Sequence, residues 1–123
     1  MNFNNFSDPQ RQALLDLLVL GMYSDDNLTM AEDAVVQSLL DTFQFDSDYS
    51  RNRYLDASIA RVREKTQTTD SERAYAVSLA QNFDSPEDQR TVYETLERLL
   101  ASDDGVSAKE SRLLSVVKEV FKM

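Results

Sequence analysis

The chain has 123 residues, of which 41% are hydrophobic and 28% are charged, as is usual for one globular domain with a single core. It contains no cysteine and no histidine, which excludes disulfides, thiolate or imidazole metal sites and histidine-based catalysis, and leaves oxygen ligands suited to calcium or magnesium. A net charge of −9 disfavours binding to nucleic acid or to anionic lipid surfaces.

The N-terminal residues lack the cationic segment of a secretory signal. The longest apolar run covers residues 13–23, is interrupted by Asp16 and is too short to span a bilayer. We therefore expect a soluble, cytoplasmic protein without direct membrane insertion, in which residues 1–123 form a single domain.

The hydrophobic periodicity is helical, and no β-type alternation is sustained. Asp8 as N-cap and Pro9 in the first turn predict a helix that runs to about Met22. This helix is apolar on every side, which is typical of a helix at the centre of a bundle. The second helix is predicted to begin with a capping box formed by Thr29 and Glu32, and to bury one apolar face.

Residues 44–50 are polar and predict a connection. A third helix is predicted over residues 51–65, with Tyr54 on its inward face and Arg61 on its outward face. Residues 66–69 form the clearest break in the pattern.

Two helix starts are predicted after this break. Thr69 and Glu72 have the spacing of a capping box and predict a short helix. Ser85 as N-cap and Pro86 at the first helical position predict the next helix. A last helix follows the second of two repeated acidic turns.

These turns are nearly identical to each other in sequence. Residues 23–32 read YSDDNLTMAE, and residues 101–110, which follow 78 positions later without a gap, read ASDDGVSAKE. Each stretch leaves an apolar helix, makes an acidic turn and begins a new helix with Ser/Thr-x-x-Glu. The sequence therefore predicts an all-α fold: a compact bundle of six to seven helices with two pseudo-symmetric helix–acidic turn–helix halves, residues 8–65 and 69–123.

Helix capping explains most of the residues in these turns. Asn27 and Gly105 occupy equivalent positions and are the residue types that best tolerate the left-handed backbone at the end of a helix. Thr29 and Ser107 are then N-caps of the following helices. Under this interpretation the turns are purely structural.

The alternative interpretation is that the turns bind a divalent cation. Carboxylate oxygens are the ligands that calcium and magnesium prefer. The final Glu follows the first Asp by only seven residues, too few for the loop of an EF-hand, so we expect a weak, partly hydrated site that the two turns share if they meet. The candidate metal ligands are Asp25, Asp26, Glu32, Asp103, Asp104 and Glu110.

Enzymatic activity is not expected. Paired carboxylates act as acid and base on glycosides, but such chemistry needs a cleft lined with aromatic side chains. The chain has no tryptophan, and its five tyrosines occur at positions typical of a helical core. We therefore predict no catalytic residues.

The repeated pattern of helix, Asp-Gly turn, aliphatic residue and Glu on a new helix resembles the TerB-like tellurite-resistance domain family. The second copy, residues 102–110, matches the family pattern well. The first copy departs at Asn27, where the family usually has glycine, and Asn preserves the backbone conformation. Through the doubled unit, the resemblance covers essentially the whole chain.

The resemblance implies an all-helical bundle of two pseudo-symmetric halves, acting in bacterial tellurite resistance or a related stress response. It also implies a cytoplasmic module that works with protein partners, including membrane-associated and metal-binding ones. At matching positions, the metal-contact residues would be Asp26, Glu32, Asp104 and Glu110. We therefore expect a non-enzymatic module that presents acidic turns as a divalent-cation or protein-contact surface, and the alternative is a scaffolding domain whose turns are helix caps.

Overall fold

The computed structural model describes residues 6–22, 30–101 and 108–123. These ranges contain no strand and form six helices: α1 (Asp8–Met22), α2 (Met30–Leu40), α3 (Asp48–Lys65), α4 (Thr69–Ala80), α5 (Pro86–Leu100) and α6 (Ala108–Phe121). The predicted all-α fold is therefore confirmed. None of the helices in these ranges combines the length and the apolar character needed to cross a membrane.

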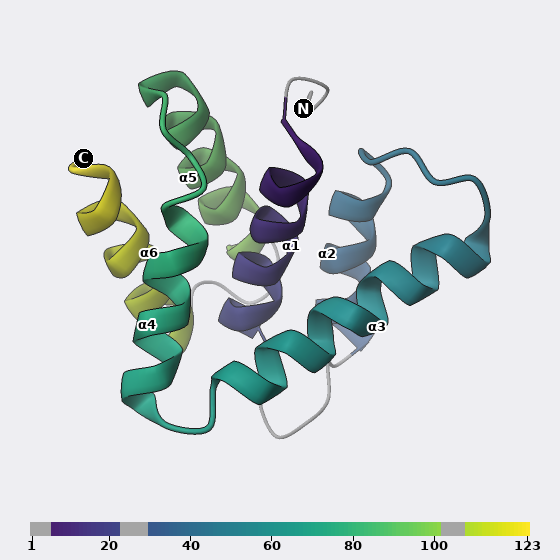
Figure 1. Cartoon of the computed structure of the whole chain (residues 1–123), viewed down its shortest axis with the longest axis horizontal. Coiled ribbons are helices and arrows are strands. Elements are labelled where there is room, and N and C mark those ends of the chain that lie inside the picture. Colours follow the sequence, from purple (N-terminus) through teal and green to yellow (C-terminus); the bar gives the residue numbers. More distant parts are fainter. Residues whose placement is uncertain (1–5, 23–29, 102–107) are drawn as a thin grey trace.

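The central helix of the bundle is α1. Every residue from Ala13 to Met22 is buried, and each of the other five helices packs against α1 (Figure 1). The apolar residues that surround α1 on every side therefore have a neighbour in each direction, as expected for a helix of this pattern. All six helices contribute side chains to the one hydrophobic cluster that results.

The sequence repeat is reproduced in the positions of the helices. The bounds of α5 are those of α1 shifted by 78 residues, and α6 begins 78 residues after α2. The two units nevertheless have different surroundings, since α1 is enclosed whereas α5 exposes Arg90, Glu94 and Glu97. The two-fold arrangement of halves 8–65 and 69–123 stays a prediction.

The first helix starts one residue away from its predicted cap. Ser7, and not Asp8, has the role of the N-cap of α1: the backbone N–H of Gln10 donates to Ser7 Oγ over 3.3 Å, and the Ser7 N–H donates to Gln10 Oε1 over 2.9 Å. This reciprocal pair is a capping box, and the Ser-x-x-Gln spacing favours it over a cap at Asp8.

The predicted capping box at Thr69 and Glu72 is also wrong by one residue. In α4 the N-cap is Thr68, whose Oγ1 accepts from the Ser71 N–H over 3.0 Å, while the Thr68 N–H donates to Ser71 Oγ over 3.0 Å. Two adjacent threonines allowed either register, and serine three residues after Thr68 completes the box.

The start of α5 is as predicted, with Ser85 Oγ accepting from the backbone of the first turn.

The third helix starts earlier than predicted. Ser47 is its N-cap and accepts from the Ser50 N–H over 3.1 Å, so α3 gains three residues at its beginning, Asp48, Tyr49 and Ser50. Tyr49 in this added turn is 68% exposed, and so the expectation that all tyrosines occupy core positions is wrong. The Arg53 guanidinium lies over its ring, 5.8 Å from the centroid.

Candidate functional site

The acidic turns join helices whose ends match in position. α1 ends at Met22 and α2 begins at Met30, while α5 ends at Leu100 and α6 begins at Ala108. Figure 1 shows α1 and α5 running in one direction, with α2 and α6 returning in the other. Both turns therefore connect helices at the end of the bundle where α1 and α5 finish, which we call the acidic-turn end.

The last residues of α1 and α5 are in close contact at this end. A Cβ atom placed on Gly21 would lie 2.8 Å from Leu113 Cδ2 and 3.1 Å from Leu100 Cδ2. Only a residue without a side chain allows α1, α5 and α6 to approach this closely without rearrangement. The points from which the two turns depart are thus neighbours in space.

Four of the six predicted metal ligands, Asp25, Asp26, Asp103 and Asp104, lie outside the described residues. Their role as ligands stays a prediction. Among the residues that are described, no three or more Asp, Glu, His or Cys side chains are grouped so that they could hold a metal ion. A calcium or magnesium site at the acidic-turn end would therefore need the carboxylates of the turns themselves.

The other two predicted ligands occupy equivalent places. Glu32 is in the first turn of α2 and Glu110 is in the first turn of α6, and both are half-buried. A carboxylate in the first turn is stabilised by the positive end of the helix dipole, by about 0.3–1 kcal/mol. This position suits a capping residue and a cation ligand equally well.

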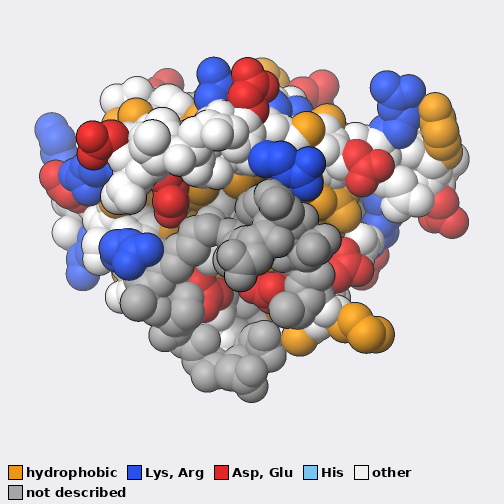
Figure 2. All heavy atoms as spheres, turned by 90° about the horizontal axis from the view of Figure 1, so that it is seen from below, with side chains coloured by type: hydrophobic (Ala, Val, Ile, Leu, Met, Phe, Trp, Pro, Cys, Tyr) orange, Lys and Arg blue, Asp and Glu red, His pale blue; other side chains and the backbone are white. Residues whose placement is uncertain are grey.

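Figure 2 shows the molecule from the side of the acidic-turn end. Acidic and basic side chains are interspersed around the rim of this face. The carboxylate excess that the sequence predicts at this end belongs to the turns, whose aspartates lie outside the described residues.

Sequence reasoning missed a buried carboxylate that accepts four hydrogen bonds. Asp16, in the middle of α1, has no exposed surface. The Arg61 guanidinium donates to both of its oxygens over 2.9 Å, the Tyr75 hydroxyl donates to Oδ2 over 2.6 Å, and the Ser58 hydroxyl donates to Oδ1. Asp16 thereby connects α1 to α3 and α4. The prediction that Arg61 faces outward is wrong, because the buried charge on Asp16 requires a cationic partner.

The charge of Asp16 also alters the protonation of its neighbours. The hydrogen bond to Asp16 raises the pKa of Arg61 above its usual value, although burial of the guanidinium acts in the opposite direction. Burial raises the pKa of the Tyr75 hydroxyl, and the hydrogen bond to Asp16 raises it further. Both residues therefore keep the protons they donate to Asp16. An inaccessible carboxylate with four donated hydrogen bonds has the properties of a structural group.

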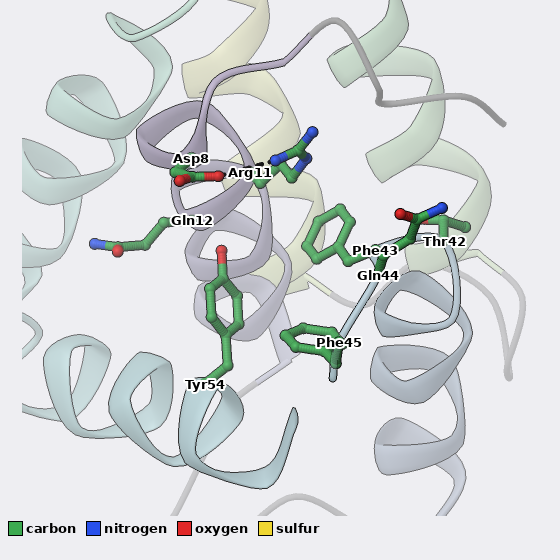
Figure 3. A pocket seen from close by; sticks show the side chains of 8 residues that line it. All are labelled: Asp8, Arg11, Gln12, Thr42, Phe43, Gln44, Phe45 and Tyr54. Atoms are coloured by element: carbon green, nitrogen blue, oxygen red, sulfur yellow. Dashed lines mark hydrogen bonds and ion pairs between the residues drawn. The ribbon is translucent and has the colours of Figure 1, made fainter. Parts of the chain in front are cut away.

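An open cavity of about 450 Å³ lies near the opposite end of α1 (Figure 3). It is bounded by the first turns of α1, by the connection from α2 to α3, and by Tyr54 of α3. The ring of Tyr54 packs edge to face with those of Phe43 and Phe45, and the two phenylalanine rings are tilted against each other, with all centroids 5.4–6.5 Å apart. The sequence predicted Tyr54 as inward-facing, whereas Phe45 lies in the connection between α2 and α3, where no helical periodicity marks it as a core residue.

Comparison of the chain with protein-family models, with curated proteins and with solved structures finds no match.

Proposed function

We propose that this chain is a non-enzymatic, TerB-like helical module of the tellurite-resistance or stress-response type. Its acidic-turn end presents carboxylates to a divalent cation, calcium or magnesium, and to a protein partner. The partners that the resemblance implies include membrane-associated proteins, and the module acts in the cytoplasm.

The close contact at Gly21 is the observation that carries this proposal. Because α1 and α5 end against each other, two turns with the same acidic sequence leave from adjacent points. Neither turn alone has enough residues to surround a calcium ion, but two neighbouring turns can each supply part of the oxygen ligands, with water completing the shell. The pseudo-symmetric arrangement of the two halves is part of this proposal.

The cation proposal is tested by thermal unfolding. Protein treated with a chelator is titrated with calcium, magnesium and zinc, and the Tm is followed. A cation present at 100 times its Kd should add about 2.7 kcal/mol to the free energy of unfolding. An unchanged Tm at millimolar calcium and magnesium would contradict the cation site.

A matched pair of variants locates the site. The turn variant changes Asp25, Asp26, Asp103 and Asp104 to Asn, and should lose the cation-dependent rise in Tm. The control variant removes the same amount of charge from exposed positions elsewhere and should keep it: Asp46→Asn, Asp56→Asn, Asp84→Asn and Glu94→Gln. Used as baits, the same two variants test the protein contact, because a partner that binds the acidic-turn end should be lost with the turn variant only.

The alternative proposal is a scaffolding domain whose acidic turns are helix caps. It is favoured by the hydroxyl caps found at the starts of α1, α3, α4 and α5. In the sequence, Thr29 and Ser107 stand directly before α2 and α6, where such a cap belongs.

One substitution distinguishes the two proposals. Glu32→Gln keeps a side chain that can complete a capping box but weakens a carboxylate site. If Glu32 is a ligand, the apo protein should unfold at the same temperature as the wild type while its response to calcium or magnesium is lost. If Glu32 acts only as a cap, glutamine takes over that role, so the apo protein should keep most of its stability and the cation should have no effect on either protein.

A further inference from the structure

The cavity at the beginning of α1 has the features of a small-molecule site, and it is separate from the acidic-turn end. Its volume of about 450 Å³ lies in the range of ligand pockets, roughly 300–1,000 Å³. Along α1 it lies roughly 20 Å from the acidic turns, given a rise of about 1.5 Å per residue.

One side of the cavity offers flat aromatic surface. Tyr54 rises from α3, and Phe43 and Phe45 stand across from it (Figure 3). The rings of Phe45 and Tyr54 are half-buried, so each retains surface that a ligand can cover. A planar aromatic group is complementary to such walls, because it can stack against one ring while meeting the edge of another.

The Tyr54 hydroxyl is a hydrogen-bond donor that lines the cavity. In Figure 3 the Tyr54 hydroxyl points toward the first turns of α1. No described residue forms a hydrogen bond with this hydroxyl, although burial raises the pKa of Tyr54 to about 12 and so keeps its proton in place. A protonated phenol that points into a cavity is available to donate to an acceptor on a ligand.

The charged residues of the cavity add a cationic donor. Arg11 donates from Nη1 to Asp8 Oδ1 over 2.9 Å, which uses one of its five N–H groups. The Arg11 side chain is 28% exposed, whereas that of Asp8 is 95% exposed. The Arg11 side chain is therefore the less exposed of the two, and the positive end of the α1 dipole adds to its charge. Solvent screens the charge of the exposed Asp8 more strongly than that of Arg11, so the cavity offers an anionic group a less screened partner than it offers a cation.

We propose that this cavity binds a small planar aromatic molecule that carries one carboxylate. The aromatic ring lies against Phe45 and Tyr54, and the carboxylate accepts hydrogen bonds from the Tyr54 hydroxyl and the Arg11 guanidinium. The side-chain amide of Gln12, at the rim, is a further donor.

The proposal is tested by NMR titration of the ¹⁵N-labelled full chain with three indole probes of the same shape. These are indole-3-carboxylate, the neutral indole-3-carboxamide and the cationic 3-(aminomethyl)indole. The carboxylate should bind with a Kd below about 1 mM, and the shifted amide signals should belong to residues 8, 10–12, 42–45 and 54. Stronger binding of the amide or the amine, or shifts that lie elsewhere, would overturn the proposal.

Two variants test the donors. Tyr54→Phe removes only the hydroxyl and should weaken carboxylate binding about tenfold, the loss expected for one hydrogen bond to a charged group. Tyr93→Phe, on α5 and outside the cavity, is the matched control and should bind as the wild type does. Arg11→Gln should reduce the preference for the carboxylate over the carboxamide. A Tyr54→Phe protein that keeps its dispersed spectrum and binds the carboxylate with unchanged Kd would contradict the assignment of the donor.

Discussion

Asp16 and the acidic residues of the acidic-turn end show two ways in which this chain uses carboxylates. Asp16 is fully buried and accepts hydrogen bonds from three side chains on two neighbouring helices. Glu32 and Glu110 are half-buried in the first turns of their helices, and Asp33 is exposed. Asp16 is held inside the fold, whereas Glu32, Asp33 and Glu110 lie at an end of the bundle that can contact solvent, ions or a partner.

The difference is a consequence of solvation. A charge removed from water must be compensated by donors, so Asp16 determines the positions of Ser58, Arg61 and Tyr75. A charge that remains in contact with water has no such requirement, and its contribution to folding is small. The repeated acidic motif is therefore the more conspicuous feature of the sequence, while the single Asp16 matters more for stability.

The largest effect is expected for Asp16→Ala. This change leaves Arg61, Tyr75 and Ser58 without their shared acceptor and should lower the free energy of unfolding by about 3–5 kcal/mol. Urea unfolding followed by far-UV circular dichroism measures the loss. The exposed Asp56→Ala in α3 is the control and should change stability by less than about 0.5 kcal/mol. A loss below about 1 kcal/mol for Asp16→Ala would mean that the network does not stabilise the fold.

The next largest effect is expected for Tyr75→Phe, which removes one of the donors to Asp16. A hydrogen bond to a charged group contributes about 1.5–3 kcal/mol, and the lower value is expected because Tyr75 is only half-buried.

The dependence of this effect on pH follows from the raised pKa of Tyr75. The stabilisation is fully present below the tyrosine pKa in the unfolded chain, about 10, and is lost as the pH rises toward the higher pKa in the folded protein. Wild-type stability should therefore fall above pH 10, and that of Tyr75→Phe should fall less steeply. Equal alkaline slopes would contradict this assignment. Tyr54, whose pKa is raised to about 12, contributes a loss of the same sign between about pH 10 and 12.

A third effect, of about 1–3 kcal/mol, is expected for Gly21→Val. The new side chain must displace the δ-carbons of Leu100 and Leu113, which overpacks the junction of α1, α5 and α6. Gly21→Ala should cost less, because the flexible Leu113 side chain can move and alanine favours the helix by about 1 kcal/mol. Thermal and urea unfolding of both variants measures the difference. If Gly21→Val were as stable as the wild type, the two helix ends would not be in close contact.

The sequence predicts the fold well wherever the signal is local. The all-round apolar pattern of residues 13–22 places α1 at the centre, and Ser85 with Pro86 marks the start of α5. Where two neighbouring residues can both act as the N-cap, the prediction is wrong by one position: the caps are Ser7 and Thr68. The oxygen of either neighbour can accept a hydrogen bond from the same backbone N–H, so the sequence does not distinguish them.

The features that depend on tertiary contacts could not be predicted in this way. A single Asp in an apolar helix indicates a buried charge, but nothing local shows that its partners come from α3 and α4, 42 to 59 residues later. The aromatic cavity also depends on contacts between separate segments. Phe45 lies in the connection between α2 and α3 and contacts Tyr54 only in the folded chain. For the candidate cation site, Glu32 and Glu110 occupy the helix starts that the repeat predicts, and the aspartates of the turns lie outside the described residues.

The smallest effect is expected for Asp33→Asn, at the acidic-turn end. The favourable interaction of Asp33 with the N-terminus of α2 is opposed by repulsion from the other acidic residues of a chain with net charge −9. The change in the free energy of unfolding should therefore stay below about 1 kcal/mol and should vanish at about 1 M salt, where the Debye length is only about 3 Å. The loss caused by Asp16→Ala should persist at that salt concentration, because a buried pair is screened far less. Measuring both variants in low and high salt thus separates the two uses of carboxylates directly. A salt-independent cost for Asp33→Asn would place Asp33 among the structural carboxylates with Asp16.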